Sequence, residues 1–410
     1  MSKISDSKLA DPGKKNFEWA KKHMNALVKL ADRHAEKKTL EGLRLGVCLH
    51  ITKETSVLID SLLRAGAELF VAAANPLSTS DDIAAYIATR AEIWAWKGET
   101  EEEYKWCIKQ VLSKKPDQII DDGADMHVMA HELKAKWIRG GTEETTTGVL
   151  RLRAMEDEGK LAYPVIAVNN AKTKFLFDNR YGTGQSTIDG ILRATSLLLA
   201  GKNFVVVGYG WVGRGIAIRA RGMGSKVYVV EVDPIRALEA HLEGFEVGKM
   251  SDFARIGDIF LTATGQKNVI RYEHIEKMKD GAILANAGHF DVEIDVKTLT
   301  LKARKIREVR PNVEEFELPN GRSVYLLARG RVANLVAAEG HPPEVMQMSF
   351  ANQFEATVHI HKNYSKMKPK LYDVPESVEI EVAKAALSAY GIETEKMTAE
   401  QRKYSRSWKI

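Results

Sequence analysis

A glycine-rich segment in the middle of the chain constrains the fold more than any other feature. Residues 205–217 read VVVGYGWVGRGIA, so Gly208, Gly210 and Gly213 form the pattern G-x-G-x-x-G directly after a run of valines. The first glycine of this pattern permits a tight turn, the second lets the backbone approach a pyrophosphate, and the third lets a helix pack closely on a strand. The segment therefore predicts a strand, a turn and a helix whose positive N-terminus faces a dinucleotide.

Glu231 and Arg236 extend this prediction to the ribose of the dinucleotide. Glu231 ends the next apolar run, KVYVVE, at the distance of about 20 residues that is typical of such motifs. A carboxylate there accepts hydrogen bonds from ribose hydroxyls and repels a 2′-phosphate, which favours NAD over NADP. Arg236 lies close by in the sequence and weakens this preference.

Short apolar runs alternate with amphipathic stretches along most of the chain, which predicts α/β architecture with mostly parallel sheets covered on both faces. Asn320-Gly321 between two apolar alternations predicts a hairpin in addition. Strands are expected at 43–51, 68–74, 92–96, 118–121, 137–140, 164–169, 203–208, 226–231, 258–264 and 281–287, and helices at 17–34, 53–67, 101–112, 186–201 and 378–391.

Length and composition limit the classes of protein to consider. The chain has 410 residues, which predicts two or three domains, and a net charge of only +5 with no basic run of the kind that nucleic-acid binding requires. Two cysteines, Cys48 and Cys107, argue against a disulfide scaffold, and we expect both to be reduced core residues. The first residues lack the apolar centre of an export signal, and no apolar stretch is long enough for a membrane span, so a cytoplasmic protein is expected.

Eight further segments occur in an order that is typical of one enzyme family. Together they closely resemble S-adenosyl-L-homocysteine hydrolase, in a compact form of prokaryotic or archaeal type, over residues 40 to 365. The segments are CLHITKETSVLI (48–59), NPLSTSDD (75–82), AWKGETEEEYKWCI (95–108), DDGADMH (121–127), GGTEETTTGV (140–149), KTKFLFDNRYG (172–182), NAGHFDVEID (286–295) and NLVAAEGHPPEVM (334–346).

The resemblance implies a definite architecture. It comprises two doubly wound parallel-sheet α/β domains, one for substrate and one a Rossmann domain for NAD, with a short helical C-terminal tail. We expect the substrate domain at 1–178, the NAD domain at 184–340, a return to the substrate domain at 343–373, and a tail with oligomer contacts at 374–410. Crossings near 179–184 and 341–343 would then form a hinge for closure over substrate.

The resemblance also implies an activity. The family cleaves S-adenosylhomocysteine reversibly to adenosine and homocysteine, with NAD that is regenerated in each cycle, usually in a homotetramer. Oxidation of the ribose 3′-hydroxyl to a ketone makes the C4′ hydrogen acidic, so that homocysteine leaves by elimination, water adds, and the ketone is reduced again. Small-molecule substrates and NAD are therefore the expected partners, without metal, nucleic acid or membrane.

Acid–base chemistry is implied at five positions. Lys174 and Asp178 match the family's pair at the 3′-hydroxyl, where a lysine beside a positive nicotinamide is expected to have a lowered pKa and to accept the hydroxyl proton. His50, Asp122 and His289 match the group around C4′ and C5′, where the ordinary pKa of histidine suits proton transfer. Which of these three protonates the sulfur and which removes the C4′ proton is left open.

The remaining implied contacts surround the substrate and the cofactor. Substrate contacts, besides Lys174 and Asp178, are expected at the ribose and the base, from Thr52, Glu54, Glu144 and His341. Cofactor contacts are expected from Thr145, Thr146, Thr147, Asn179, Gly208, Gly210, Gly213, Glu231, Arg236 and Asn334.

Several positions depart from the family pattern or leave alternatives open. Thr183 stands where cysteine is common, Glu339 where methionine is common, and the usual C-terminal ending is absent. A carboxylate at Glu54 accepts from the amino group of adenine and repels the carbonyl of hypoxanthine, which favours adenosine; S-inosyl-L-homocysteine hydrolysis, plain dehydrogenation and a non-catalytic NAD-binding role are the alternatives. His127 and His131 have metal-ligand spacing, but we interpret them as ordinary helix residues.

Overall fold

The computed structural model describes residues 2–408, and its N-terminal part is built on a seven-stranded sheet in which every pairing is parallel. The strand order is β15-β6-β5-β4-β1-β2-β3. The strands are β1 (Arg44–Leu49), β2 (Glu68–Ala73), β3 (Glu92–Trp94), β4 (Gln118–Asp121), β5 (Gly140–Glu143), β6 (Val165–Ala167) and β15 (Leu371–Asp373).

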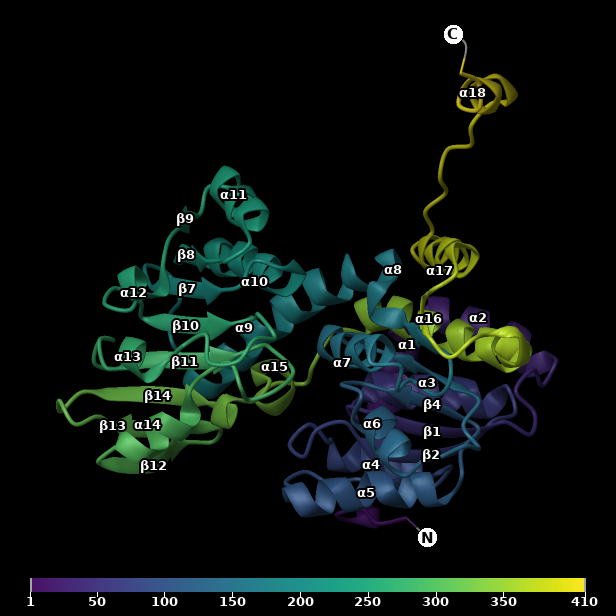
Figure 1. The fold of residues 1–410 in the computed structure, drawn as a ribbon, viewed down its shortest axis with the longest axis horizontal. Helices are drawn as coiled ribbons and strands as arrows, with labels where there is room; N and C mark the ends of the chain where they lie inside the picture. The colour runs from purple at the N-terminus through teal and green to yellow at the C-terminus, as the bar shows by residue number, and fades with distance from the viewer. Residues whose placement is uncertain (1, 409–410) are drawn as a thin grey trace.

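A second sheet of eight strands forms the other lobe of the molecule, in the order β12-β13-β14-β11-β10-β7-β8-β9 (Figure 1). The strands from β14 to β9 in this order pair in parallel, whereas β12–β13 and β13–β14 pair antiparallel. Asn320-Gly321 lies in the β13–β14 hairpin, as predicted. The strands are β7 (Asn203–Val207), β8 (Lys226–Val230), β9 (Glu246–Val247), β10 (Ile259–Thr262), β11 (Ala282–Asn286), β12 (Lys305–Arg310), β13 (Val313–Glu317) and β14 (Ser323–Leu327).

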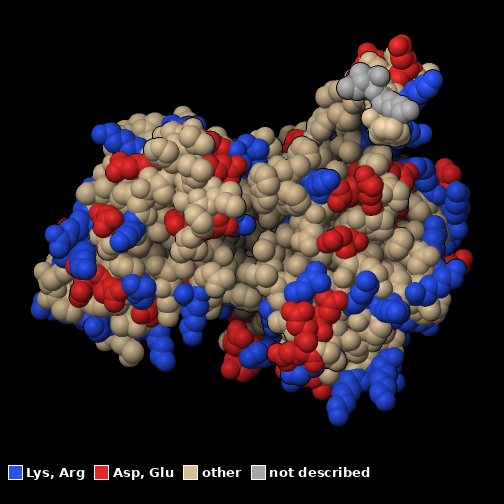
Figure 2. Space-filling model, turned by 45° about the horizontal axis from the view of Figure 1, so that its top comes forward, with Lys and Arg blue, Asp and Glu red and all other residues tan. Residues whose placement is uncertain are grey.

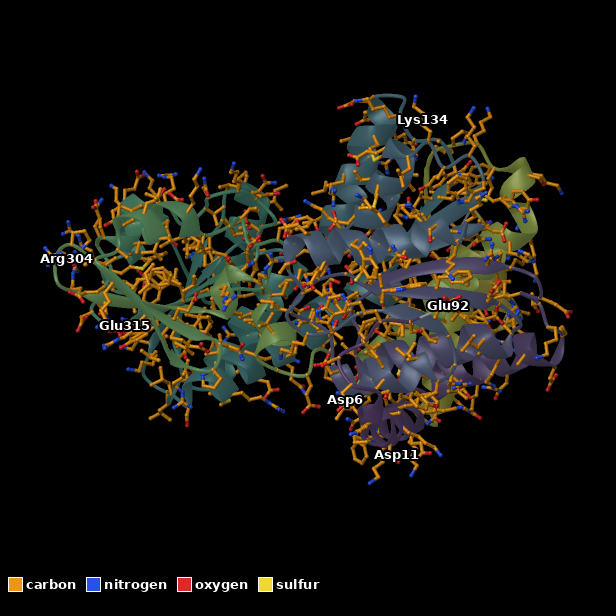
Figure 3. All side chains as sticks on the ribbon, turned by 90° about the horizontal axis from the view of Figure 1, so that it is seen from below. Asp6, Asp11, Glu92, Lys134, Arg304 and Glu315 are labelled. Carbon is orange, nitrogen blue, oxygen red and sulfur yellow. The ribbon has the colours of Figure 1, made fainter. Side chains whose placement is uncertain are left out.

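Edge strand β12 is exposed along its whole length, and its sequence KIREVR is rich in charged residues. Such charges protect an open sheet edge from pairing with other chains. Figure 3 places Arg304 and Glu315 at the outer end of this lobe, away from the other lobe.

Helices cover both sheets. The first sheet is covered by α1 (Ala10–His23), α2 (Asn25–Glu36), α3 (Lys53–Arg64), α4 (Asp81–Ala88), α5 (Glu101–Ser113), α6 (Asp125–Glu132), α7 (Thr146–Asp157), α8 (Lys172–Phe175), α16 (Pro343–Asn363) and α17 (Glu376–Ala389). The second lobe holds α9 (Thr183–Thr195), α10 (Trp211–Gly222), α11 (Pro234–Leu242), α12 (Met250–Phe253), α13 (Tyr272–Ile275), α14 (Val296–Lys302) and α15 (Ala333–Val336).

Three predicted elements differ from the structure. The single helix expected at 17–34 is two helices, which break at Met24, a residue with φ −116° and ψ 42°. The helix expected at 186–201 ends at Thr195, because Ser196 adopts a left-handed conformation with φ 55°. The strand expected at 137–140 is wrong, since pairing with β4 begins only at Gly140.

The replacement strand β5, GGTE, has no apolar pattern because its neighbours approach too closely for larger side chains. A Cβ on Gly140 would lie 2.7 Å from Ile360 of α16, and one on Gly141 would lie 2.4 Å from His127 of α6. The strand is therefore buried on both faces without contributing hydrophobic side chains of its own.

The chain crosses between the lobes twice. A short π-helix, η3 (Asp178–Gly182), leads into α9 of the second lobe, and the loop after α15 leads back into α16, which runs beside the first sheet. β15 then pairs with β6, so residues far apart in the sequence complete one sheet.

The C-terminal segment extends beyond the two lobes. α18 (Ala399–Tyr404) stands away from the body of the molecule at the end of an extended stretch (Figures 1 and 2). None of the helices within residues 2–408 has the length and apolarity that a membrane span requires.

Candidate active site

The carboxyl ends of neighbouring strands place the first candidate residues. His50 follows β1 and Asp122 follows β4, and these two strands are adjacent although the sheet continues in opposite directions from them. Such a point, where the strand order reverses, is where open α/β sheets bind ligands. β7 and β10 form the equivalent point in the second sheet, and Gly208 directly follows β7.

One cavity brings together predicted residues from both lobes, and Figure 2 shows the surface hollowed between them. The predicted residues that line it are His50, Thr52, Glu54, Asp122, Glu144, Thr145, Lys174, Asp178, Asn179, His289, Asn334 and His341. Residues that are 291 positions apart in the sequence, from His50 to His341, therefore face the same space.

Lys174 lies at the centre of a buried charged cluster. Its Nζ is 2.7 Å from Asp178 Oδ2 and 3.8 Å from Glu144 Oε1. It also donates hydrogen bonds to Asn179 Oδ1 at 2.9 Å and to Asn169 Oδ1 at 3.4 Å. Asn169 is thus a direct partner of the lysine.

The cluster sets the charge states of its members. Burial alone would lower the pKa of Lys174, but the carboxylates of Asp178 and Glu144 outweigh burial and raise it. This direction is opposite to that expected for a lysine beside a positive nicotinamide, because it reflects the protein's groups alone. Burial opposes the charge of Asp178 as well, yet His341 and Lys174 hold its pKa well below the usual range.

His341 connects this cluster to the loop between the lobes. Its Nδ1 forms an ion pair with Asp178 Oδ1, and its Nε2 lies 3.2 Å from Thr183 Oγ1. Burial disfavours the charged ring, but Asp178 outweighs it and raises the pKa of His341. The hydroxyl of Thr183, at the position where the family commonly has cysteine, is therefore a partner of this histidine.

His50, Asp122 and His289 form a second group across the cavity. Asp122 lies between the two rings, with Oδ2 3.5 Å from His50 Nε2 and Oδ1 3.6 Å from His289 Nδ1. Burial lowers the pKa of His50 to about 4 and also lowers that of His289. Both rings are thus neutral near neutral pH, which leaves nitrogen lone pairs able to accept protons.

Ser78, Ser349 and Gln353 are partners that the sequence interpretation missed. Ser78 Oγ lies 2.7 Å from His50 Nδ1 and fixes that ring. On α16, Ser349 donates to Glu144 Oε1 and Gln353 donates to its Oε2 at 2.5 Å. Burial raises the pKa of Glu144 to about 7. The spacing of Ser349 and Gln353 at i, i+4 on one helix face was the available signal.

The glycine-rich turn has the geometry that a pyrophosphate requires. Gly208 has φ +100°, and a Cβ there would lie 2.7 Å from the carbonyl of Ala263, while a Cβ on Gly213 would lie 1.9 Å from the carbonyl of Gly208. Gly210, by contrast, faces open space, with the nearest atom, on Arg236, 3.6 Å from its Cβ position. The turn therefore leaves room at the second glycine, where the backbone must approach the ligand.

Glu231 is held at the rim of a second cavity, which Gly208, Gly210 and Arg236 also line. Its carboxylate accepts hydrogen bonds from the backbone N–H of Tyr209 at 2.6 Å and of Asp233 at 2.9 Å. The side chain is thus fixed beside the turn, with oxygen lone pairs left for ribose hydroxyls.

Unsatisfied buried atoms lie where the cofactor contacts were predicted. Within residues 2–408, Asn334 Oδ1 and Thr147 Oγ1 are buried and have no hydrogen-bond partner. The methyl group of Thr147 also lies 3.3 Å from the Cβ position of Gly265, near the end of β10. Thr145 lines the central cavity, whereas Thr146 lines neither of the two cavities. These observations fit a dinucleotide that extends from the glycine turn into the central cavity.

Two groups of side chains have metal-ligand proximity among the described residues, His50 with Asp122 and His289, and Asp121 with His127 and Glu143. Both ring nitrogens of His127 contact protein oxygens, of Tyr163 and Thr142. His131 donates to the carbonyl of His127. Both histidines are therefore engaged in contacts with protein groups.

Comparisons with known proteins identify the family of this chain. The family model described as S-adenosyl-L-homocysteine hydrolase matches residues 1–137, and the one described as its NAD binding domain matches residues 179–340. Adenosylhomocysteinase of Sulfurisphaera tokodaii is 57% identical over 99% of both chains, and that of Saccharolobus solfataricus is 54% identical over 99% of both. S-inosyl-L-homocysteine hydrolase of Methanocaldococcus jannaschii is 51% identical over 100% of this chain and 99% of its own.

A solved structure of a dipicolinate synthase chain from Bacillus halodurans shares the fold, with a TM-score of 0.50, 13% identity, and coverage of 80% of this chain and 99% of its own. The two family models and the relatives of similar full length place the whole chain in a single family. The chain belongs to the S-adenosyl-L-homocysteine hydrolase family.

Proposed function

We propose that this protein is an adenosylhomocysteinase that hydrolyses S-adenosyl-L-homocysteine reversibly to adenosine and homocysteine with NAD as its cofactor. The observation that carries the proposal is the convergence of the Lys174–Asp178 pair and the His50–Asp122–His289 group on one cavity. A thioether carbon is a poor target for water, so both groups are needed. One assists oxidation at C3′, and the other transfers protons at C4′ and C5′.

When bound, NAD would supply the hydride acceptor for oxidation of the 3′-hydroxyl and, once reduced, the hydride donor for the final reduction of the ketone. Gly208, Gly210, Gly213, Glu231 and Arg236 would hold its pyrophosphate and adenosine half. Thr145, Thr146, Thr147, Asn179 and Asn334 would hold its nicotinamide half, where the unsatisfied Oδ1 of Asn334 gains a donor from a carboxamide.

In this proposal Lys174 accepts the proton of the 3′-hydroxyl, and Asp178 orients it. The ammonium group that the carboxylates stabilise must first lose its proton. A positively charged nicotinamide bound in this cavity would favour that loss. Glu144, fixed by Ser349 and Gln353, holds the ribose hydroxyls in reach of the lysine.

His50, Asp122 and His289 share the proton transfers of elimination and water addition. The two histidines are neutral and accept protons, whereas Asp122 orients both rings and stabilises either in its charged form. Ser78 keeps His50 in one orientation. A group of three, rather than one base, serves steps that occur on two neighbouring carbons.

We assign residues 1–178 and 343–373 to a substrate domain and residues 184–340 to an NAD domain. The two chain crossings support closure of one lobe on the other, which shields the ketone from stray proton exchange.

A homotetramer is the assembly we propose. Within the tail proposed at 374–410, α17 packs on the first lobe through Val382 and Ala386, whereas α18 stands away from the body and carries exposed Tyr404. In the other lobe, α11 exposes an apolar stripe of Ile235, Leu238 and Leu242. Exposed apolar groups of this kind mark interaction surfaces. Light scattering should give the mass of four chains, and a chain ending at residue 391 should give a smaller assembly. We also propose a cytoplasmic location, which the two free buried cysteines favour.

The decisive experiment is thiol release. Protein loaded with NAD should release homocysteine from S-adenosyl-L-homocysteine, detected by a thiol reagent, with no net change in cofactor oxidation state. Steady accumulation of reduced cofactor would instead identify a dehydrogenase. Absence of both thiol release and cofactor reduction would support the non-catalytic alternative and overturn the proposal.

A further inference from the structure

Lys53 contacts Glu54, the residue expected at the base of the substrate, and belongs to a chain of charged groups that runs from one lobe to the other. It lies in the first turn of α3, and its Nζ is 3.3 Å from Glu54 Oε1 and 3.1 Å from Glu339 Oε2. Glu339, on the loop before α16, also accepts from Arg193 of α9 at 3.2 Å. The side chain of Lys53 is only 15% exposed, so its ammonium group is held in place beside Glu54.

Glu54 is the carboxylate that Lys53 approaches, and it is 1% exposed. It lines the central cavity, and among the described residues none gives its Oε1 a hydrogen bond of good geometry. This oxygen has the ion pair with Lys53, and as a carboxylate oxygen it can also accept a hydrogen bond from a ligand in the cavity. The charged groups around it are Lys53, His341 and, beyond the lysine, Glu339.

The protonation state of this carboxylate decides which purine it can bind. An ionised carboxylate only accepts hydrogen bonds, so it pairs with a 6-amino group and repels a 6-oxo group. A protonated carboxyl group also donates, so it can bind the 6-oxo group. Burial raises the pKa of Glu54, whereas Lys53 opposes this rise. The relative binding of the two purines therefore depends on whether burial or the ammonium group of Lys53 has the larger effect on the pKa of Glu54.

We propose that Lys53, anchored by Glu339, is a specificity-determining residue that keeps Glu54 ionised and thereby selects S-adenosyl- over S-inosyl-L-homocysteine. The inference rests on the proposed hydrolysis and deepens it. Base preference is a variable property in this family, because relatives with similar identity are named for both bases. Lys53 acts through Glu54 and is absent from the lining of the central cavity.

The test compares kcat/KM for thiol release from the two nucleosides between pH 5 and 9 in the NAD-loaded protein. Lys53→Met should lower the preference for the 6-amino substrate by about tenfold at neutral pH, equivalent to about 1.4 kcal/mol. As the pH is lowered, Lys53→Met should lose its preference for the 6-amino substrate at a higher pH than the wild type does. The reason is that removal of a positive charge stabilises the protonated carboxyl group of Glu54. Lys105→Met, at an exposed lysine on α5, is the matched control and should change neither value.

Two further variants keep the result interpretable. Glu339→Gln removes the anchor at a side chain that is 61% exposed, so folding is unaffected, and it should shift the preference in the same direction by a smaller factor. Glu54→Gln should abolish the pH dependence of the ratio, with or without Lys53. An unchanged ratio in Lys53→Met and Glu339→Gln, or equal losses for both substrates, overturns the inference while thiol release persists. Failure of the wild type to release thiol from either substrate overturns the proposed function instead.

Discussion

Replacement of Lys174 separates its role as a base from its role as a positive charge. Lys174→Arg keeps a cation beside Asp178, but guanidinium does not lose its proton in the range of pH at which proteins are folded. Lys174→Met removes both the charge and the base. If Lys174 takes the 3′-hydroxyl proton, both variants should fail at the oxidation step, and only Lys174→Met should also lose stability.

The magnitudes follow from the contacts of the lysine. At 2.7 Å and an effective dielectric constant of about 20, the Lys174–Asp178 attraction is about 6 kcal/mol before desolvation. Breaking a buried pair by removing one partner costs about 3–5 kcal/mol, and we expect about 3 kcal/mol here because His341 still compensates Asp178. Loss of a general base should slow oxidation by about 10²–10⁴-fold, or about 3–5 kcal/mol in the barrier.

Rapid mixing of NAD-loaded protein with adenosine isolates the oxidation step, because reduced cofactor then appears without thioether cleavage. Denaturant unfolding of the same variants gives the change in their free energy of unfolding. In Asp178→Asn, the acid limb of the oxidation rate should move to lower pH, since Asp178 raises the pKa of Lys174. Cofactor reduction in Lys174→Arg within about twofold of the wild-type rate would refute the assignment, because no general base contributes so little.

The other predictions concern the second acid–base group and the cofactor turn. Gly123→Ala places a Cβ 2.4 Å from His289 Nε2, so thiol release should fall by about 100-fold while cofactor reduction persists. Gly159→Ala, also at positive φ but with open space, should cost about 1 kcal/mol of stability and leave turnover intact. Because the pKa of His50 is lowered to about 4, the unfolded chain binds the proton first, and unfolding free energy should fall by about 3 kcal/mol as pH drops from 6.5 to 4; His50→Gln should remove this part of an acid titration monitored by circular dichroism. Glu231→Gln should reduce the ratio of the dissociation constants of NADP and NAD by about tenfold in equilibrium dialysis. An unchanged ratio would show that repulsion of the 2′-phosphate by Glu231 does not cause the preference for NAD.

The sequence predicted the fold well wherever strands bury apolar side chains. Runs such as VVVG at β7 and AILAN at β11 were assigned correctly because their residues form the core of a sheet. The strand at β5 was misplaced because Gly140 and Gly141 leave space for α16 and α6 rather than filling it. A hydrophobic pattern identifies a strand that contributes apolar side chains to the core. It cannot identify a strand that is buried by the side chains of its neighbours.

The candidate site was predictable as a set of residues, but its charge states were not. Motif matches brought Lys174 and Glu144 to one cavity, yet the direction of each pKa depends on packing that the motifs do not contain. Burial and the distant Ser349 of α16 act on Glu144. Glu144, 30 positions away, acts on Lys174 together with its near neighbour Asp178. The same applies to Lys53, which by spacing alone is a surface residue in the first turn of a helix and becomes significant only through Glu339.

The polar strand β5 lies beside the loop of Asp122, and its residues explain why the hydrophobic pattern did not predict this part of the sheet. Glu143 accepts hydrogen bonds from the N–H groups of Gly123 and Thr145, and thus ties the loop of Asp122 to the start of α7. Burial raises the pKa of Glu143 strongly, and the charge of the neighbouring carboxylates adds to the effect. Through these two hydrogen bonds the Glu143 side chain positions the loop that carries Asp122. An apolar side chain would satisfy the hydrophobic pattern of a buried strand, but it would leave both N–H groups unpaired, so the polar strand is what allows Asp122 to orient two neutral histidines.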